Sequence, residues 1–201
     1  MKPKILTITL IVILIGAASW IFIISHQHWR NLFRNPKAEV MPNQKELTES
    51  LPVFKNQMKL TSFLFYHNGG LPLSATCDGK GVNPPFDIAG VHEGAKALAL
   101  IVKDPDAPGA TFIHWTVWNI DPQTTKIKEN SVPDNATQGI TSARRAGYIA
   151  ACPPSGTHHY IFSLYALDKV LDLPVSTTAA DLEDAMEGHI LNKADLTGLY
   201  V

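Results

Sequence analysis

Three short segments of the chain carry side chains that could bind a ligand or transfer protons. Asp104 and Asp106 frame a proline directly after an apolar run, so two carboxylates follow an expected buried strand. His114 lies in a segment rich in β-forming residues, and the segment 152–160 reads CPPSGTHHY. Imidazole and phenol groups donate hydrogen bonds to anionic oxygens, and carboxylates can hold imidazoles in place. These residue types could form part of a ligand site.

Each segment has a simpler interpretation when it is taken alone. The two aspartates could be solvated side chains on a turn made rigid by prolines. A histidine beside aromatic residues, as at His114, is more often a hydrogen-bonded core residue than a functional one. A metal site built from His114, His158 and an aspartate has no support from ligand spacing. We therefore expect neither a metal nor another cofactor.

The elements that must position these residues are mostly strands. Runs of β-forming or apolar residues predict strands at 58–66, 97–103, 111–119 and 159–167. Thr178 can cap a helix, with Asp181 three residues later, and apolar residues then recur at helical spacing through Met186 to His189 and Ile190. Mostly strands with one late helix favour a mainly β, sandwich-like core with helical additions.

The alternation of side chains along 111–119 predicts which residues share a face of the sheet. One face would carry Ile113, Trp115 and Val117. The other face would carry Phe112, His114, Thr116 and Trp118.

The N-terminal region differs in composition from the rest of the chain. Residues 5–24 contain no charged side chain, and this length is enough for a helix to cross a bilayer. We expect a membrane or signal anchor at 1–25, a polar linker at 26–56 and a folded domain at 57–201. A cleaved signal peptide is the alternative, because Gly16, Ala17 and Ala18 could form a cleavage site. Both interpretations place the domain outside the cytoplasm, anchored on the periplasmic side or secreted.

The net charge argues against a nucleic-acid-binding protein, and the cysteine content argues against a structural zinc site. The formal net charge is −1, whereas a nucleic-acid-binding protein should present a basic face. Only two cysteines are present, without a C-x-x-C pair, so we do not expect a structural zinc site.

Motifs spread over about residues 58–201 match, in order, those of one family. They are Thr76-Cys77-Asp78-Gly79, Asn83-Pro84-Pro85, Asp104-Pro105-Asp106-Ala107-Pro108, His114-Trp115, Cys152-Pro153-Pro154 with Gly156, His158 and Tyr160, and Tyr165-Ala166-Leu167-Asp168. In these motifs the chain resembles the bacterial phosphatidylethanolamine-binding proteins, also called Raf kinase inhibitor-like proteins.

The resemblance implies two antiparallel sheets with peripheral helices and a cavity for a phosphate-like anion or a phospholipid head group. The positions that match the family's pocket are Asp104, Asp106, His114, Pro154, His158 and Tyr160. His159 stands where the family usually has an arginine, so a permanent cation is replaced by a titratable one.

The resemblance also implies a function without catalysis, namely anion or head-group binding, and inhibition or regulation of a kinase or protease whose identity the sequence does not reveal. The alternative is a hydrolase in which His114, His158 and Asp106 form an acid–base set. That alternative lacks a nucleophile, because Ser155 is not in a nucleophile-elbow pattern.

Cys77 and Cys152 both lie in motifs of this family, on loops that we expect at the same end of the domain. A disulfide between them is one interpretation, and an exported domain would permit it. Two separate buried thiols are the interpretation that we favour, since the sequence cannot supply the short Cα separation that a bridge requires.

Overall fold

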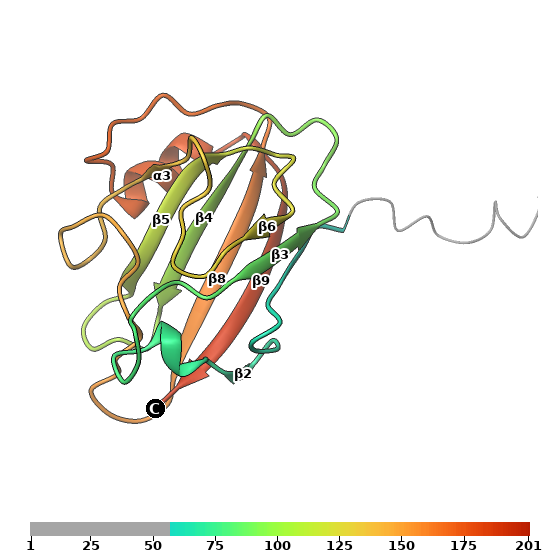
Figure 1. Cartoon of the computed structure of the whole chain (residues 1–201). Coiled ribbons are helices and arrows are strands. Elements are labelled where there is room, and N and C mark those ends of the chain that lie inside the picture. The colour runs from blue at the N-terminus through green and yellow to red at the C-terminus, as the bar shows by residue number, and fades with distance from the viewer. Residues whose placement is uncertain (1–56) are drawn as a thin grey trace, which may run out of the picture. The chain divides into compact units, whose positions relative to one another are not determined.

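Two β-sheets packed face to face form the main part of the fold (Figure 1). The computed structural model describes residues 57–201. The small sheet has three strands in the order β1-β3-β6, and the large sheet has six in the order β2-β9-β8-β4-β5-β7. The elements are β1 (Lys59–Thr61), β2 (Gly69–Gly70), η1 (Leu73–Ala75), β3 (Phe86–Ala89), β4 (Ala97–Asp104), β5 (Phe112–Ile120), β6 (Lys126–Ile127), β7 (Thr137–Gln138), β8 (His158–Leu167), α3 (Ala179–Met186) and β9 (Ile190–Tyr200).

The predicted mainly β fold with two sheets is confirmed, and two of its details are corrected. Strands within the two sheets pair in antiparallel fashion, except that β2 runs parallel to β9, with Gly69 opposite Gly198. The exception arises because the chain leaves the small sheet after β1 and joins the edge of the large sheet in the direction of β9. In place of several peripheral helices, residues 57–201 contain one α-helix, α3, and the short 3-10 helix η1.

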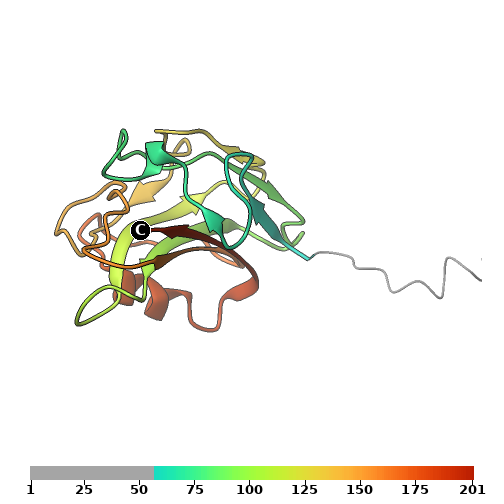
Figure 2. The same ribbon diagram turned by 90° about the horizontal axis from the view of Figure 1, so that it is seen from below.

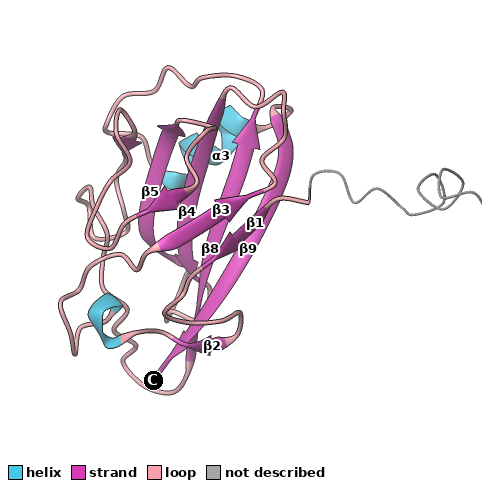
Figure 3. Cartoon of the chain, turned by 45° about the vertical axis from the view of Figure 1, so that its right-hand side comes forward, coloured by secondary structure: helices cyan, strands magenta, loops and turns pink. Residues whose placement is uncertain are grey.

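The core lies between the two sheets. Figure 2 shows the small sheet on one side of the large sheet and α3 on the other. Phe86 of β3 packs against Phe162 of β8 with ring centroids 5.2 Å apart. Leu98, Leu100 and Val102 of β4 are fully buried in the same cluster. Figure 3 shows α3 behind one end of the large sheet. A second, smaller cluster of buried side chains joins α3 to the outer face of that sheet.

The long strands predicted at 97–103, 111–119 and 159–167 are confirmed as β4, β5 and β8. The strand predicted at 58–66 is shorter, because only Lys59–Thr61 pairs with β3. Beyond it the chain bends away from the small sheet, and the backbone N–H of Asn68 donates to Thr197 O of β9 at 2.8 Å. Phe63 and Tyr66 are then left largely exposed, at 77% and 79% of their surface.

The alternation predicted for β5 is wrong at Ile113. The pairing of β5 with β4 shifts by one residue between Trp115 and Ile113, so that His114 is an extra residue in the strand. This β-bulge breaks the period of two. Ile113 packs beneath α3 with Trp118, whereas Trp115 and Val117 enter the core between the sheets.

The predicted cap of α3 is confirmed, but the predicted extent of the helix is too long. Thr178 accepts a hydrogen bond from the Asp181 backbone N–H, and the Asp181 side chain accepts one from Thr178 in return. The helix ends at Met186, since Gly188 adopts a φ of 75°. That left-handed conformation redirects the chain into β9, so Ile190 begins a strand.

The anchor expected at 1–25 and the linker expected at 26–56 lie outside the described residues. Within 57–201, the structure contains no helix long and apolar enough to cross a membrane.

Candidate anion-binding site

A small cavity of about 220 Å³ opens where β4 ends and β8 begins, at the lower end of the sheets in Figure 1. Because β4 and β8 are antiparallel neighbours, with Lys103 opposite Ile161, the end of one lies beside the start of the other. Five of the six residues predicted from the sequence line this cavity, namely Asp104, His114, Pro154, His158 and Tyr160. Residues more than 50 positions apart in the chain are thereby brought to one site.

Asp104 and His158 form a buried pair in this cavity. The distance from Asp104 Oδ2 to His158 Nδ1 is 2.7 Å, and the two side chains are 5% and 7% exposed. The other carboxylate oxygen of Asp104, Oδ1, accepts the backbone N–H of Asp106 at 2.9 Å. Both oxygens are therefore satisfied within the protein, which lowers the cost of burying the charge. The carboxylate orients His158 so that Nδ1–H points at Asp104 and Nε2 is left for a ligand.

His114 is held by a backbone carbonyl. Its Nδ1 lies 2.9 Å from Ile149 O, and because a carbonyl only accepts, this nitrogen carries the proton. The Ile149 backbone N–H donates in turn to His114 O at 2.8 Å, which fixes both ends of the contact. Burial lowers the pKa of His114 below its ordinary value, although the Ile149 contact and Asp104 oppose the shift. Neutral His114 therefore offers a lone pair at Nε2.

Tyr160 supplies the third polar group. Its side chain is 1% exposed, and its hydroxyl oxygen makes no normal hydrogen bond with any residue in 57–201. Burial raises the pKa of this phenol, Asp104 adds to the rise, and the backbone of Cys152 opposes it. The hydroxyl thus remains protonated at neutral pH, and its edge contact with His114, at 5.1 Å between ring centroids, places the two side by side.

A disulfide secures the proline loop that borders the cavity. Cys77 and Cys152 are bridged, with Cα atoms 5.4 Å apart, so the interpretation as two separate thiols is wrong. Two backbone hydrogen bonds hold the segments that carry the two cysteines close together: Cys77 N–H donates to Ala151 O at 3.0 Å, and Ala151 N–H donates to Ala75 O at 3.1 Å. Cys152 lines the cavity together with Pro153 and Pro154.

Gly79 allows the chain to fold back against η1 next to this disulfide. A Cβ at this position would stand 1.9 Å from the carbonyl oxygen of Leu73, which is backbone and cannot move aside. Only glycine fits there, which gives the last residue of the Thr-Cys-Asp-Gly motif a structural role.

Asp106, the sixth predicted residue, is not among those that line the cavity. Its carboxylate Oδ2 accepts both the backbone N–H of His159 at 2.8 Å and the side-chain Nδ1 of His159 at 2.7 Å. The contact with His159 lowers the pKa of Asp106. Asp106 therefore ties the 104–108 turn to the start of β8 from outside the cavity.

Apolar side chains that the sequence prediction did not include complete the walls. Phe112 lies against His114 with ring centroids 4.7 Å apart, and Pro108 and Ile149 also line the cavity. Phe112 could have been found from alternation, since it lies two residues before His114 on the same strand. Ile149 could not have been found in this way, because its position in the wall depends on a long-range backbone contact with His114.

The arrangement can bind a group that both accepts and donates hydrogen bonds. Tyr160 O–H is a donor, whereas neutral His114 Nε2 is an acceptor. The described residues contain no group of three or more His, Cys, Asp or Glu side chains placed to hold a metal ion.

Comparison with known proteins identifies the family. Residues 61–201 match the model of the family described as phosphatidylethanolamine-binding protein. A UPF0098 protein of Methanothermobacter thermautotrophicus is 45% identical over 148 residues, which are 71% of this chain and 98% of that protein. A UPF0098 protein of Pyrococcus horikoshii is 42% identical over 73% of this chain and 77% of that protein.

Two solved structures share the fold. A phosphatidylethanolamine-binding protein homologue from Chlamydia trachomatis has a TM-score of 0.70 and 39% identity, over 73% of this chain and 98% of that one. E. coli YbcL, a member of the mammalian phosphatidylethanolamine-binding protein family, has a TM-score of 0.67 and 30% identity, over 71% of this chain and 97% of that one. The chain belongs to the phosphatidylethanolamine-binding protein family.

Proposed function

We propose that the cavity binds a phosphate-like group as a monoanion, either as a free anion or as part of a phospholipid head group, and does not turn it over. The observation that carries this proposal is the Tyr160 hydroxyl, which is buried beside two histidines and makes no normal hydrogen bond among the described residues, apart from a weaker contact with the Cys152 backbone. A buried hydroxyl without a partner costs free energy that a ligand oxygen would recover.

The charge of the site favours a monoanion over a dianion. Asp104 already brings a negative charge to the cavity, so a dianion would be repelled. Where the monoanion keeps a proton, as in dihydrogen phosphate, its O–H can donate to His114 Nε2, and a bare oxygen can accept from the Tyr160 O–H.

Binding without hydrolysis is favoured because the cavity lacks a nucleophile. Its lining contains no serine or threonine, and the sulfur of Cys152 is bonded to Cys77. Ser155, the nucleophile considered for the alternative hydrolase, is exposed and does not line the cavity.

The place and the role of the protein are part of the same proposal. The exposed disulfide supports a compartment outside the cytoplasm, because thiols are kept reduced inside most cells. A membrane anchor at 1–25 would then hold the domain on the periplasmic side. There the domain would act as a head-group-binding inhibitor or regulator of a kinase or protease.

Calorimetric titration with phosphate and phosphoethanolamine tests the proposal. The wild-type chain should bind both ligands, and Tyr160→Phe should weaken binding by about tenfold, since a hydrogen bond to a charged group contributes about 1.5–3 kcal/mol. His159→Ala is the matched control, because its side chain is outside the cavity. Phosphorus NMR of the phosphoethanolamine mixture should show no free phosphate. Release of phosphate would establish the hydrolase instead, and absence of binding at millimolar concentration would refute the proposal.

A further inference from the structure

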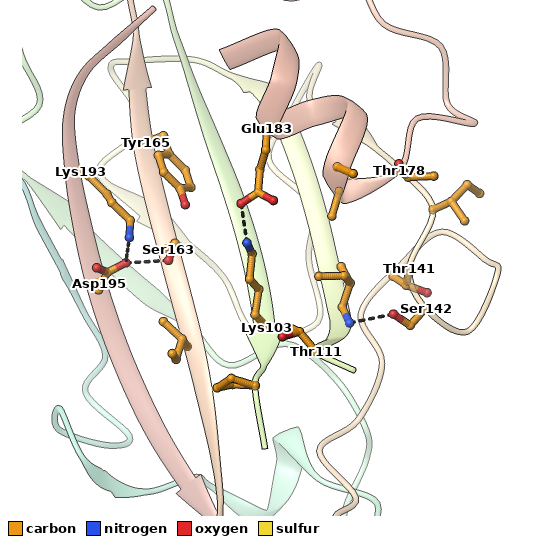
Figure 4. A pocket seen from close by; sticks show the side chains of 16 residues that line it. Lys103, Thr111, Thr141, Ser142, Ser163, Tyr165, Thr178, Glu183, Lys193 and Asp195 are labelled. Carbon is orange, nitrogen blue, oxygen red and sulfur yellow. Dashed lines mark hydrogen bonds and ion pairs between the residues drawn. The ribbon is translucent and has the colours of Figure 1, made fainter. Parts of the chain in front are cut away.

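A second, larger cavity lies on the outer face of the large sheet, the face partly covered by α3 (Figure 4). This outer groove has a volume of about 630 Å³ and shares no lining residue with the anion cavity. Side chains of β4, β5, β8 and β9 form its floor, and residues of α3 and the segment 140–142 form its walls. Its size falls within the range of pockets that hold small organic ligands.

The charged side chains of the outer groove are paired with one another. Lys103 of β4 forms an ion pair with Glu183 of α3. On β9, Lys193 forms another with Asp195, with Nζ 2.9 Å from Oδ1 (Figure 4). Two cations and two carboxylates leave the groove without net charge. A ligand with a net charge of either sign therefore gains little attraction, and a zwitterion would have to open both pairs to reach them.

Tyr165 offers a polar group that no residue uses. The residue is 8% exposed, and its hydroxyl makes no hydrogen bond within residues 57–201. In Figure 4 the hydroxyl points from β8 toward the side of the groove where Lys103 and Glu183 lie. Lys193 Nζ lies 5.4 Å from the centre of the ring and so holds its orientation. The phenol hydroxyl can therefore donate a hydrogen bond to a ligand oxygen or accept one from a ligand hydroxyl.

Hydroxyl groups on a ligand match this combination of side chains. An ammonium group has three donors and a carboxylate has about four acceptor sites, so each ion pair retains capacity after its partner is bound. A hydroxyl both donates and accepts, and can therefore bond either member of a pair without breaking it. Ile113, Ile140 and Ile161 add apolar surface on which the C–H faces of a ring could lie.

We propose that the outer groove binds an uncharged oligosaccharide. The Tyr165 hydroxyl and the two ion pairs hydrogen-bond its hydroxyl groups, and the isoleucines contact its C–H faces. This site is separate from the anion cavity, so the two can be occupied independently.

The full-length chain, purified in a detergent without a sugar head group, should be titrated with maltotriose, cellotriose and triacetylchitotriose. Saturation-transfer NMR and calorimetry measure binding, and hydrogen exchange with mass spectrometry locates it. At least one trisaccharide should bind at millimolar concentration or below and protect peptides from β8, β9 and α3. Binding of none of the three would overturn the proposal, as would protection confined to other elements.

Two variants test the groove itself. Tyr165→Phe should weaken trisaccharide binding by about fivefold, as expected for loss of one neutral hydrogen bond. Tyr66→Phe is the matched control on an exposed tyrosine that does not line the groove.

Ala180→Trp is the second variant, to be used if Tyr165→Phe does not fold. It places a large side chain at an exposed position of the wall and should block the groove. Equal trisaccharide binding by the wild type and a folded variant of either kind would refute the proposal. Occupation of the groove by glycylglycine or phosphate in place of the sugars would also refute it.

Discussion

Asp104 Oδ2 and His158 Nδ1 lie 2.7 Å apart, with less than a tenth of either side chain exposed. The contact joins the last residue of β4 to the first residue of β8, so the antiparallel pairing that builds the sheet also builds the site. Breaking a buried pair by removal of one charge is costly, because the remaining group loses its partner in a poorly solvated place.

Asp104→Asn should therefore reduce both stability and anion affinity. The asparagine can still accept the Asp106 backbone N–H, but it no longer offers a charged oxygen to His158 Nδ1. We expect a loss of about 3 kcal/mol in the free energy of unfolding, measured by urea denaturation. Phosphate affinity should fall by tenfold or more in calorimetry. Asp106→Asn is the control, because that carboxylate lies outside the cavity and should change phosphate affinity much less. A greater loss of affinity in Asp106→Asn would show that the site is assigned to the wrong aspartate.

His114→Ala should weaken phosphate binding more than His159→Ala does. His114 lines the cavity, whereas the side chain of His159 is 51% exposed and bonds Asp106 outside it. The positions of 158, 159 and 160 follow strand alternation, since His158 and Tyr160 are buried and His159 is not. Parallel phosphate titrations of the two variants give the order, and the reverse order would contradict the proposed cavity.

The pH dependence of sulfate binding should report the protonation of His114. Sulfate has no proton to donate to Nε2, so it needs His114 in the charged form. Because burial lowers the pKa of His114, sulfate affinity should rise mainly as the pH falls below about 6.5, the ordinary value for histidine. His114→Asn should flatten that part of the profile. A rise of equal size in the variant would assign the titration to another group.

The same shift has a consequence for the unliganded protein. A histidine whose pKa is lowered by folding takes up its proton first in the unfolded state. Its contribution to stability is therefore complete above the ordinary histidine pKa and is lost as the pH falls toward the lowered value. The free energy of unfolding should fall less steeply with decreasing pH in His114→Asn than in the wild type.

The sequence predicts the central strands and most of the site, for physical reasons that can be named. β4 and β8 are long, nearly continuous runs of apolar or β-forming residues, and such runs are hard to place elsewhere than in a buried sheet. The short strands β6 and β7 have two residues each, too few to show a period. They exist because neighbouring strands offer them backbone partners.

Local pattern also fails where the backbone departs from regular geometry. The bulge at His114 reverses the face taken by Ile113, and nothing in the period of two signals it. Asp106 was included in the cavity because of its motif, whereas its direction depends on a contact with His159, 53 residues away. The sequence favours two separate thiols over the disulfide for the same reason, since the approach of Cys77 to Cys152 depends on the fold across their sequence separation of 75.

Reduction of the disulfide should lower both stability and anion affinity. Both cysteines are exposed, so a thiol reductant can reach the bond. Release of the cross-link restores chain entropy to the unfolded state, which for a separation of 75 residues is worth about 4 kcal/mol in the chain-entropy model. Cys152 and the two prolines after it border the anion cavity, so the loosened loop should also weaken phosphate binding.

Part of the loop structure should persist after reduction, because two hydrogen bonds to Ala75 O remain. One comes from the Ala151 backbone N–H and the other from the Tyr148 hydroxyl. We therefore expect weaker phosphate binding in dithiothreitol without global unfolding, measured by calorimetry and thermal denaturation. The double variant Cys77→Ser, Cys152→Ser is the control, and it should behave like the reduced wild type whether or not reductant is present. If reduction leaves both the free energy of unfolding and the phosphate affinity of the wild type unchanged, the cross-link does not support the cavity.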